Sequence, residues 1–209
     1  MSVAYYNPLI IEELEIEGLD VEFYIVHKFI SNQQEVYEEL KNTIPFKQET
    51  SIVFGKEYLQ KRLQCLLGEE SKTYTYAGIE RHPEPMTDTL TNIMNKVQKI
   101  VQTIDKEHPK YTSVLSNYYR DGQDKIDKHS DNEKDLIKNS IISSVSLGSD
   151  RDFDIYDKST NKRIKRITLK GGSLLLMGRN SQKKTKHAIP QQKEITEGRI
   201  NLTYRAIKE

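Results

Sequence analysis

The chain has 209 residues and a formal net charge of +1, with 35% apolar and 30% charged residues. This length suits one substantial domain with an added lobe, and the composition is typical of a soluble globular protein rather than a disordered one. Because the net charge is near zero, no overall positive field favours nucleic acid, so a nucleic-acid interface would have to be a local basic patch.

The cysteine and apolar content restrict the compartment that we expect. Cys65 is the single cysteine, which excludes a disulfide framework within the chain and fits a reducing compartment. No apolar run approaches the length of a membrane span, and residues 1–5 do not begin a basic stretch followed by an apolar core. We therefore expect a monomeric, intracellular protein of the nucleus or cytoplasm that has no membrane segment.

The N-terminal segment predicts strands followed by a short helix. Residues 12–30 contain two strand-like pieces around a turn at Gly18. Ser31 is placed to cap a helix over residues 32–42, with Gln34 in the capping-box position. Two further strands are predicted from β-propensity, at residues 51–56 and 73–78.

The prolines in residues 82–85 indicate a link between two parts of the chain. We predict an N-terminal lobe over residues 1–85 and a core domain over residues 86–209. The core begins with the clearest helix, capped by Thr87 or Asp88. Its apolar residues recur at i+3/i+4 spacing and are Leu90, Ile93, Met94, Val97, Ile100, Val101 and Ile104.

The rest of the chain is rich in short strands. The predicted strands are residues 111–119, 140–147, 151–156, 163–169, 172–177 and 199–207. Many short strands at this spacing are typical of a sandwich or barrel. The predicted fold class is α+β and mainly β: a double-stranded β-helix, or jelly roll, with supporting helices.

Three residues have the pattern of a metal site. His129 and Asp131 are at i and i+2, so on an extended segment both side chains point the same way, and His187 follows later in the chain. Two His and one carboxylate with open positions suit non-haem Fe(II), although catalytic zinc accepts the same ligands. A lone His-x-Asp is most often a surface loop, so the order of the later residues decides the interpretation.

The strand near the end of the chain supplies that context. Arg199, Asn201, Thr203 and Arg205 alternate with apolar or aromatic residues, so they share one face of a strand. Two guanidiniums on one face can bind a small dicarboxylate, because each matches a carboxylate bidentately. A zinc hydrolase gives these arginines no evident role, whereas 2-oxoglutarate does.

Together these motifs resemble the AlkB-type Fe(II)/2-oxoglutarate dioxygenases, closest to the eukaryotic branch that repairs alkylated DNA. The segments that carry the resemblance are residues 117–122, 129–133, 143–148, 151–153, 172–177, His187 and 199–205, and more weakly 17–20, 53–56 and 73–78.

The resemblance implies a role for each matching residue. His129, Asp131 and His187 would hold the iron. Arg205 would pair with the distal carboxylate of 2-oxoglutarate, and the other expected contacts of this cosubstrate are Asn117, Tyr119, Arg199, Asn201 and Thr203.

The resemblance also implies an N-terminal nucleotide-recognition lobe. Glu133, grouped with the catalytic residues, would face the base edge with Asn132. Tyr76 would stack on a flipped base, and Phe54 would enter the base stack. The full set of expected substrate contacts is Phe54, Gly55, Lys56, Tyr74, Thr75, Tyr76 and Asn132. Basic residues in the ranges 162–166 and 183–186 are candidate phosphate contacts.

The implied activity is oxidative demethylation of N-alkylated bases such as 1-methyladenine and 3-methylcytosine in DNA or RNA. It would use Fe(II), O₂ and 2-oxoglutarate and release formaldehyde, succinate and CO₂. Duplex-acting relatives carry a basic run before the first arginine, whereas residues 191–194 here are Gln-Gln-Lys-Glu, which favours single strands. The alternatives are hydroxylation of a protein or small molecule, and a nucleic-acid-binding module with a dead site.

Overall fold

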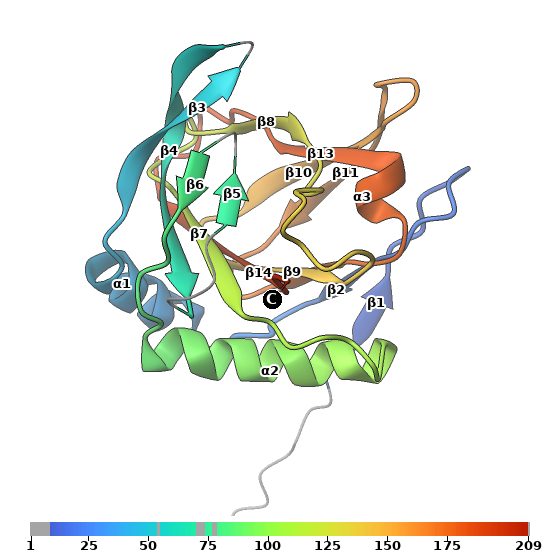
Figure 1. Cartoon of the computed structure of the whole chain (residues 1–209), viewed down its shortest axis with the longest axis horizontal. Helices are drawn as coiled ribbons and strands as arrows, with labels where there is room; N and C mark the ends of the chain where they lie inside the picture. The colour runs from blue at the N-terminus through green and yellow to red at the C-terminus, as the bar shows by residue number, and fades with distance from the viewer. Residues whose placement is uncertain (1–8, 54, 70–73, 77–78, 209) are drawn as a thin grey trace, which may run out of the picture.

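The structure, a computed structural model, describes residues 9–53, 55–69, 74–76 and 79–208 (Figure 1). Its elements in chain order are β1 (Ile11–Glu13), β2 (Phe23–Val26), α1 (Gln33–Thr43), β3 (Lys47–Val53), β4 (Lys56–Gly68), β5 (Tyr74–Tyr76), β6 (Ile79–Arg81), α2 (Asp88–Ile104), β7 (Ser113–Tyr119), β8 (Ile126–His129), β9 (Ile142–Gly148), β10 (Arg151–Asp157), β11 (Arg163–Leu169), β12 (Leu174–Met177), α3 (Ser181–Lys184), β13 (Thr185–Ile189) and β14 (Arg199–Arg205).

Two antiparallel sheets form the body of the protein. The larger has eight strands in the order β1-β2-β12-β9-β14-β7-β4-β3, and the smaller has four in the order β11-β10-β13-β8. A separate hairpin pairs β5 with β6. This arrangement is the predicted jelly roll with few helices. It brings β8 and β13, which carry the two histidines of the metal motif, together as neighbours in the smaller sheet.

Two hydrophobic clusters lie on opposite faces of the larger sheet. One joins that sheet to α1 and α2, which run along its outer side in Figure 1. The other fills the space between the two sheets and includes Leu115, Phe153 and Ile155. Strand β14 separates them, because Ile200, Leu202 and Tyr204 pack toward the helices while its other side chains face the interior.

Both predicted helices are confirmed. The Thr87 hydroxyl caps α2 by accepting a hydrogen bond from the backbone N–H of Leu90 at 3.2 Å, as its position predicts. The predicted cap of α1 is wrong by one residue. Asn32 rather than Ser31 is the N-cap, and its side chain makes no capping hydrogen bond. That N-terminus is instead held by tertiary contacts, because Gln33 accepts a hydrogen bond from the N–H of Gly148 at 2.7 Å.

The strands were predicted less completely than the helices. Strand β4 has 13 residues and joins β3 to β7, yet no strand was predicted there. Strands β8 and β13 were also missed. The two-part division at residue 85 stays a prediction, and the eight-stranded sheet draws its strands from both of the ranges 1–85 and 86–209.

Candidate active site

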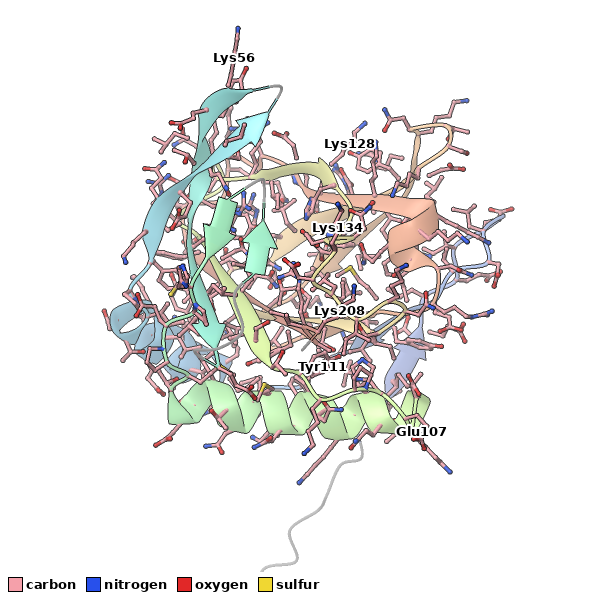
Figure 2. The ribbon with its side chains drawn as sticks, in the orientation of Figure 1. Lys56, Glu107, Tyr111, Lys128, Lys134 and Lys208 are labelled. Carbon is pink, nitrogen blue, oxygen red and sulfur yellow. The ribbon has the colours of Figure 1, made fainter. Side chains whose placement is uncertain are left out.

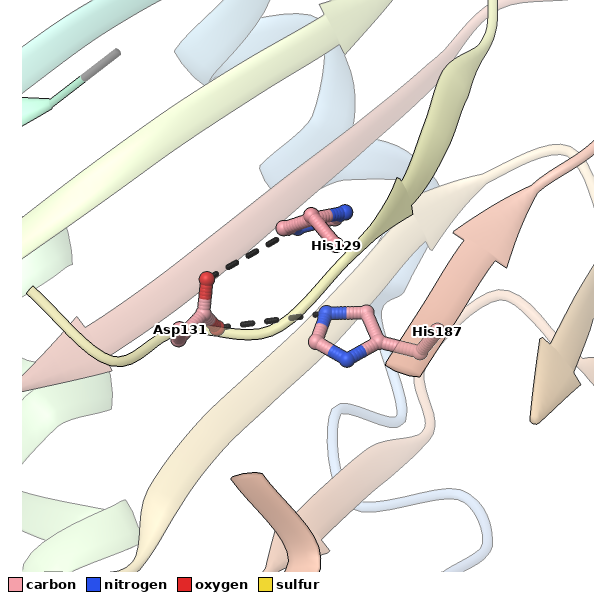
Figure 3. A group of neighbouring side chains, drawn as sticks. All are labelled: His129, Asp131 and His187. Carbon is pink, nitrogen blue, oxygen red and sulfur yellow. Dashed lines mark ion pairs between the residues drawn. The ribbon is translucent and has the colours of Figure 1, made fainter. Parts of the chain in front are cut away.

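The metal motif is positioned by β8 and β13, the two strands that the sequence does not predict. His129 ends β8 and lies directly opposite His187 of β13, so the two imidazoles are cross-strand neighbours with ring centroids 4.3 Å apart. Asp131 follows β8 by two residues and points between them (Figure 3). Its carboxylate oxygens lie 3.7 Å from His129 Nε2 and 3.9 Å from His187 Nε2. The three potential ligand atoms all lie within 4.8 Å of one another.

The protonation states of this cluster suit a divalent metal. His129 Nδ1 lies 2.8 Å from the carbonyl oxygen of Asp127, so Nδ1 carries the proton and Nε2 presents its lone pair toward Asp131. Burial, with a smaller contribution from His129, lowers the pKa of His187 to about 3 and keeps that ring neutral. Burial alone would raise the pKa of Asp131, but Arg205 and the two imidazoles hold it well below its usual range. Two neutral imidazoles and a carboxylate fit Fe(II).

Arg205 belongs to the metal end of this site. Its Nη2 forms an ion pair with Asp131 Oδ1 at 3.0 Å, and the guanidinium is buried. A cation in contact with a metal ligand is poorly placed for the far end of a dicarboxylate that chelates the same metal. The geometry therefore does not favour the predicted pairing of Arg205 with the distal carboxylate.

Arg199 lies at the other end of the same strand, in a different environment. It is 1% exposed, and its Nη2 donates to Ser146 Oγ at 2.9 Å. Among the described residues, its Nε and Nη1 have no hydrogen-bond partner. The guanidinium lies over the ring of Tyr119, 5.3 Å from the centroid, and burial lowers its pKa to about 10. A buried guanidinium with free donors is prepared for a carboxylate ligand.

The remaining predicted cosubstrate residues gather around the same interior cavity. Of these, Asn117, Tyr119 and Asn201 line it, together with the metal-motif histidines His129 and His187 and the arginines Arg199 and Arg205. Thr203 acts behind them, because its hydroxyl donates to Asn201 Oδ1 at 2.9 Å. Asn117 Oδ1 accepts from Arg62 Nε at 2.7 Å and from Gln64 Nε2 at 2.8 Å. Two side chains of β4 therefore hold the Asn117 amide that faces the cavity. The sequence does not predict this contact, because it does not predict β4.

Two further residues support the site and were not predicted. Arg151 lies on the ring of Tyr119, 5.5 Å from its centroid, and donates to the backbone carbonyls of Asp121, Asp124 and Pro190. Gln182 Oε1 accepts a hydrogen bond from the backbone N–H of Asp131 at 2.8 Å. The family resemblance includes the segment 151–153 but assigns Arg151 no role, and Gln182 has no sequence signal of its own. Each acts through contacts between segments far apart in the chain.

The predicted substrate residues are only partly described. Asn132 and Glu133 line a cavity of about 540 Å³ that opens beside Asp131. Lys56 is exposed near the tip of the β3–β4 hairpin, which projects from the sheet (Figure 2). Phe54 lies outside the described residues, although Gly55 next to it adopts a φ of +75°. Tyr74, Thr75 and Tyr76 form β5, of which the structure describes the backbone alone.

The two predicted basic segments differ in how free their charges are. Arg166 is paired with Asp154 at 2.6 Å, and Arg163 lies 3.5 Å from the same carboxylate, so the charges of these two arginines are offset within the protein. In the second segment Lys184 lies 3.6 Å from Asp20, while Lys183 lines the cavity beside Asp131.

Among the described residues, no helix is long and apolar enough to cross a membrane.

Comparison with known proteins agrees with this geometry. Residues 22–205 match the model of the 2OG-Fe(II) oxygenase superfamily. The chain is 32% identical over 205 residues to the human DNA oxidative demethylase ALKBH2, which covers 93% of this chain and 76% of that protein. It is also 32% identical to the human alpha-ketoglutarate-dependent dioxygenase alkB homolog 3, over 82% of this chain and 60% of that protein.

A solved structure shows the same fold. The structure of OsALKBH1 superimposes with a TM-score of 0.62 at 15% identity, covering 94% of this chain and 99% of that one. Family, fold and triad thus agree on the cofactors. The chain belongs to the 2OG-Fe(II) oxygenase superfamily, in its AlkB-type branch, and is a dioxygenase that uses Fe²⁺, 2-oxoglutarate and O₂.

Proposed function

We propose that this protein removes methyl groups oxidatively from N-alkylated bases such as 1-methyladenine and 3-methylcytosine in DNA or RNA. The observation that carries the proposal is the intact His129–Asp131–His187 cluster in a chain similar along most of its length to a DNA oxidative demethylase. Iron, 2-oxoglutarate and O₂, when bound, supply oxidation of the N-methyl group, which leaves as formaldehyde while 2-oxoglutarate becomes succinate and CO₂.

The protein's own residues bind and orient the reactants. His129, Asp131 and His187 hold the iron, and Gln182 fixes the backbone of Asp131. We assign the distal carboxylate of 2-oxoglutarate to Arg199, because its buried guanidinium has unfilled donors, in place of Arg205 at the metal end. Enclosure between the two sheets excludes water from the cosubstrate.

The alkylated base must leave its stack to reach the metal. Tyr76 supplies the stacking face, with Asn132 and Glu133 at the base edge. Phe54, which lies between β3 and β4 in the sequence, is assigned to fill the gap that the flipped base leaves in a duplex.

A single-strand preference is supported by residues 191–194. Gln192 of this segment points inward, since its Oε1 accepts from Arg151 Nε at 3.3 Å and from the N–H of Asp152 at 2.8 Å. Lys193 is then the one cation in the segment, with the anionic Glu194 beside it. We further propose a monomer in an intracellular reducing compartment, consistent with the buried thiol of Cys65, whose pKa burial raises to about 12.

The decisive experiment is mass spectrometry of methylated oligonucleotides after incubation with Fe²⁺, ascorbate and 2-oxoglutarate. The panel contains 1-methyladenine and 3-methylcytosine in DNA and RNA, in single and double strands. We expect loss of the methyl group with the parent protein and none with Asp131→Ala. Consumption of 2-oxoglutarate without demethylation of any oligonucleotide would transfer the assignment to hydroxylation of a protein or small molecule. Binding of oligonucleotides without consumption of 2-oxoglutarate would indicate a binding module instead.

Two substitutions separate the substrate roles. Tyr76→Ala should reduce activity on single and double strands alike, by the roughly 1–3 kcal/mol of one stacked base. Phe54→Ala should reduce activity mainly on the duplex, because a single strand has no stack to fill. Equal losses on both substrates for Phe54→Ala would remove the wedge role.

A further inference from the structure

A second cavity adjoins the metal cluster on the side of Asp131. Most of the residues that line it have no role in the function proposed above. It measures about 540 Å³, and we call it the Lys134 cavity. Its cationic side chains are Lys134, Lys138, Lys183 and Lys208, and its apolar floor includes Leu136 and Ile142. Lys134 and Lys208 lie near each other on one face of the protein in Figure 2.

The wall of this cavity is a built structure. The segment after Asp131 is pinned to the end of the chain, because the N–H of Ile137 donates to the carbonyl of Ala206 and the N–H of Lys208 to that of Asp135, both at 2.9 Å. The ammonium of Lys208 also donates to the carbonyl oxygen of Lys134. The lysines therefore project from a surface that is fixed relative to the metal ligand.

The cavity carries a local excess of positive charge. The four lysines are offset by Glu133 and by the buried Asp131, in a chain whose net charge is only +1. An apolar floor beneath a cationic rim matches a group with flat apolar faces and an attached anion, which describes a nucleotide.

The position of the cavity indicates which nucleotide of a bound strand it would hold. Asp131 is shared between the metal cluster and the cavity, and the proposed base-edge residues Asn132 and Glu133, which follow it in the chain, also line the cavity. A group in the cavity is thus an immediate neighbour of a base held at the metal. Resting on the proposed function, we propose that the Lys134 cavity binds the unpaired nucleotide next to the alkylated one, with its phosphate at the lysines and its base over the floor.

Salt dependence of binding tests the phosphate contacts. Each phosphate contact to a single strand contributes about 0.7 to the slope of log K against log[salt]. Because one phosphate is placed at these lysines, the variant Lys134→Ala/Lys138→Ala should bind a methylated single-stranded oligonucleotide with a slope shallower by about 0.7, and about fivefold more weakly at 0.1 M salt. The matched control is Lys96→Ala/Lys99→Ala on exposed positions of α2, which should bind as the parent does. Melting temperatures of both double variants control for folding.

Chemical changes in the oligonucleotide show which of its nucleotides contacts the cavity. A neutral methylphosphonate linkage on one side of the methylated nucleotide should weaken binding to the parent about fivefold and leave binding to Lys134→Ala/Lys138→Ala unchanged. Removing the base of that same neighbour should also weaken binding to the parent. Equal salt slopes for the parent and the lysine variant, or equal losses from every methylphosphonate in both, would overturn the phosphate site. No loss from the abasic neighbour would overturn the base on the floor.

These outcomes are separable from failure of the proposed function. A parent protein that demethylates oligonucleotides, with a lysine variant that binds them equally well, refutes the cavity assignment alone. A parent protein that neither binds nor demethylates any oligonucleotide refutes the function on which the cavity assignment rests.

Discussion

Replacing Arg199 by methionine should separate the stability of the protein from its affinity for 2-oxoglutarate. The side chain is 1% exposed, and among the described residues its Nε and Nη1 have no hydrogen-bond partner. Replacing buried charges by apolar groups of similar volume is often neutral or stabilising by about 1–4 kcal/mol. The ligand-free variant should therefore be as stable as the parent, or more so.

The ligand-bound state should respond in the opposite direction. At about 100 times the dissociation constant of the parent, 2-oxoglutarate binding stabilises the parent by about 2.7 kcal/mol. Loss of a buried charge pair weakens binding by about 3 kcal/mol or more, roughly 150-fold. The same ligand concentration then stabilises the variant by only about 0.3 kcal/mol.

Thermal unfolding followed by circular dichroism, with Fe²⁺ under anaerobic conditions, measures both effects. For a protein of this size, the ligand should raise the melting temperature of the parent by roughly 5–11 °C and that of the variant by about 1 °C. Arg179→Met is the matched control, because that arginine is 62% exposed and pairs with Glu22 on the surface. A ligand shift in Arg199→Met equal to that of the parent would refute the assignment. Loss of the shift in Arg205→Met, with iron still bound, would restore the original pairing.

Three further predictions concern the metal, one loop and the response to acid. Asp131→Ala should abolish 2-oxoglutarate decarboxylation, measured as succinate, and turnover at the parent rate would show that the ligands are misassigned. Gly122→Ala should destabilise the protein by about 1–3 kcal/mol in urea unfolding, because a Cβ there would lie 1.7 Å from the carbonyl oxygen of Gln192; an unchanged midpoint would mean that the two loops separate freely. Burial alone would raise the pKa of Asp154, but hydrogen bonds from Arg166 outweigh it and lower the pKa. This carboxylate therefore stabilises the fold above the unfolded pKa near 4, and the stabilisation is lost as the pH falls through the folded pKa. Urea midpoints at pH 7 and pH 3 should converge more in Asp154→Asn than in the parent, and identical pH dependence would contradict this.

Alternation made the last strand predictable. The polar and apolar faces of β14 lie as the sequence indicates, with Leu202 against the helices and Asn201 toward the interior. Alternation assigns a face, but it cannot assign a position along the site. Arg199 and Arg205 share a face, yet only the contact of Arg205 with Asp131 shows which of them is at the metal.

The strands that carry the two histidines have weaker patterns. In β13 the sequence Thr-Lys-His-Ala-Ile buries four of its five residues, so no alternation of apolar and polar residues marks it. Strand β4 begins as part of an exposed hairpin and ends in the core, so its hydrophobic pattern changes along its length. Such strands are determined by their partners, which one sequence does not reveal.

The central position of β14 determines where ligand binding can be observed. This strand is hydrogen-bonded to β7 on one edge and to β9 on the other along its length. Its amide protons exchange with solvent only when the whole sheet opens, which is already slow before a bound cosubstrate adds to the stability. The strand that carries both arginines will therefore give little signal in hydrogen exchange, and the segment from Asp131 to Ser140 will report occupancy of the site.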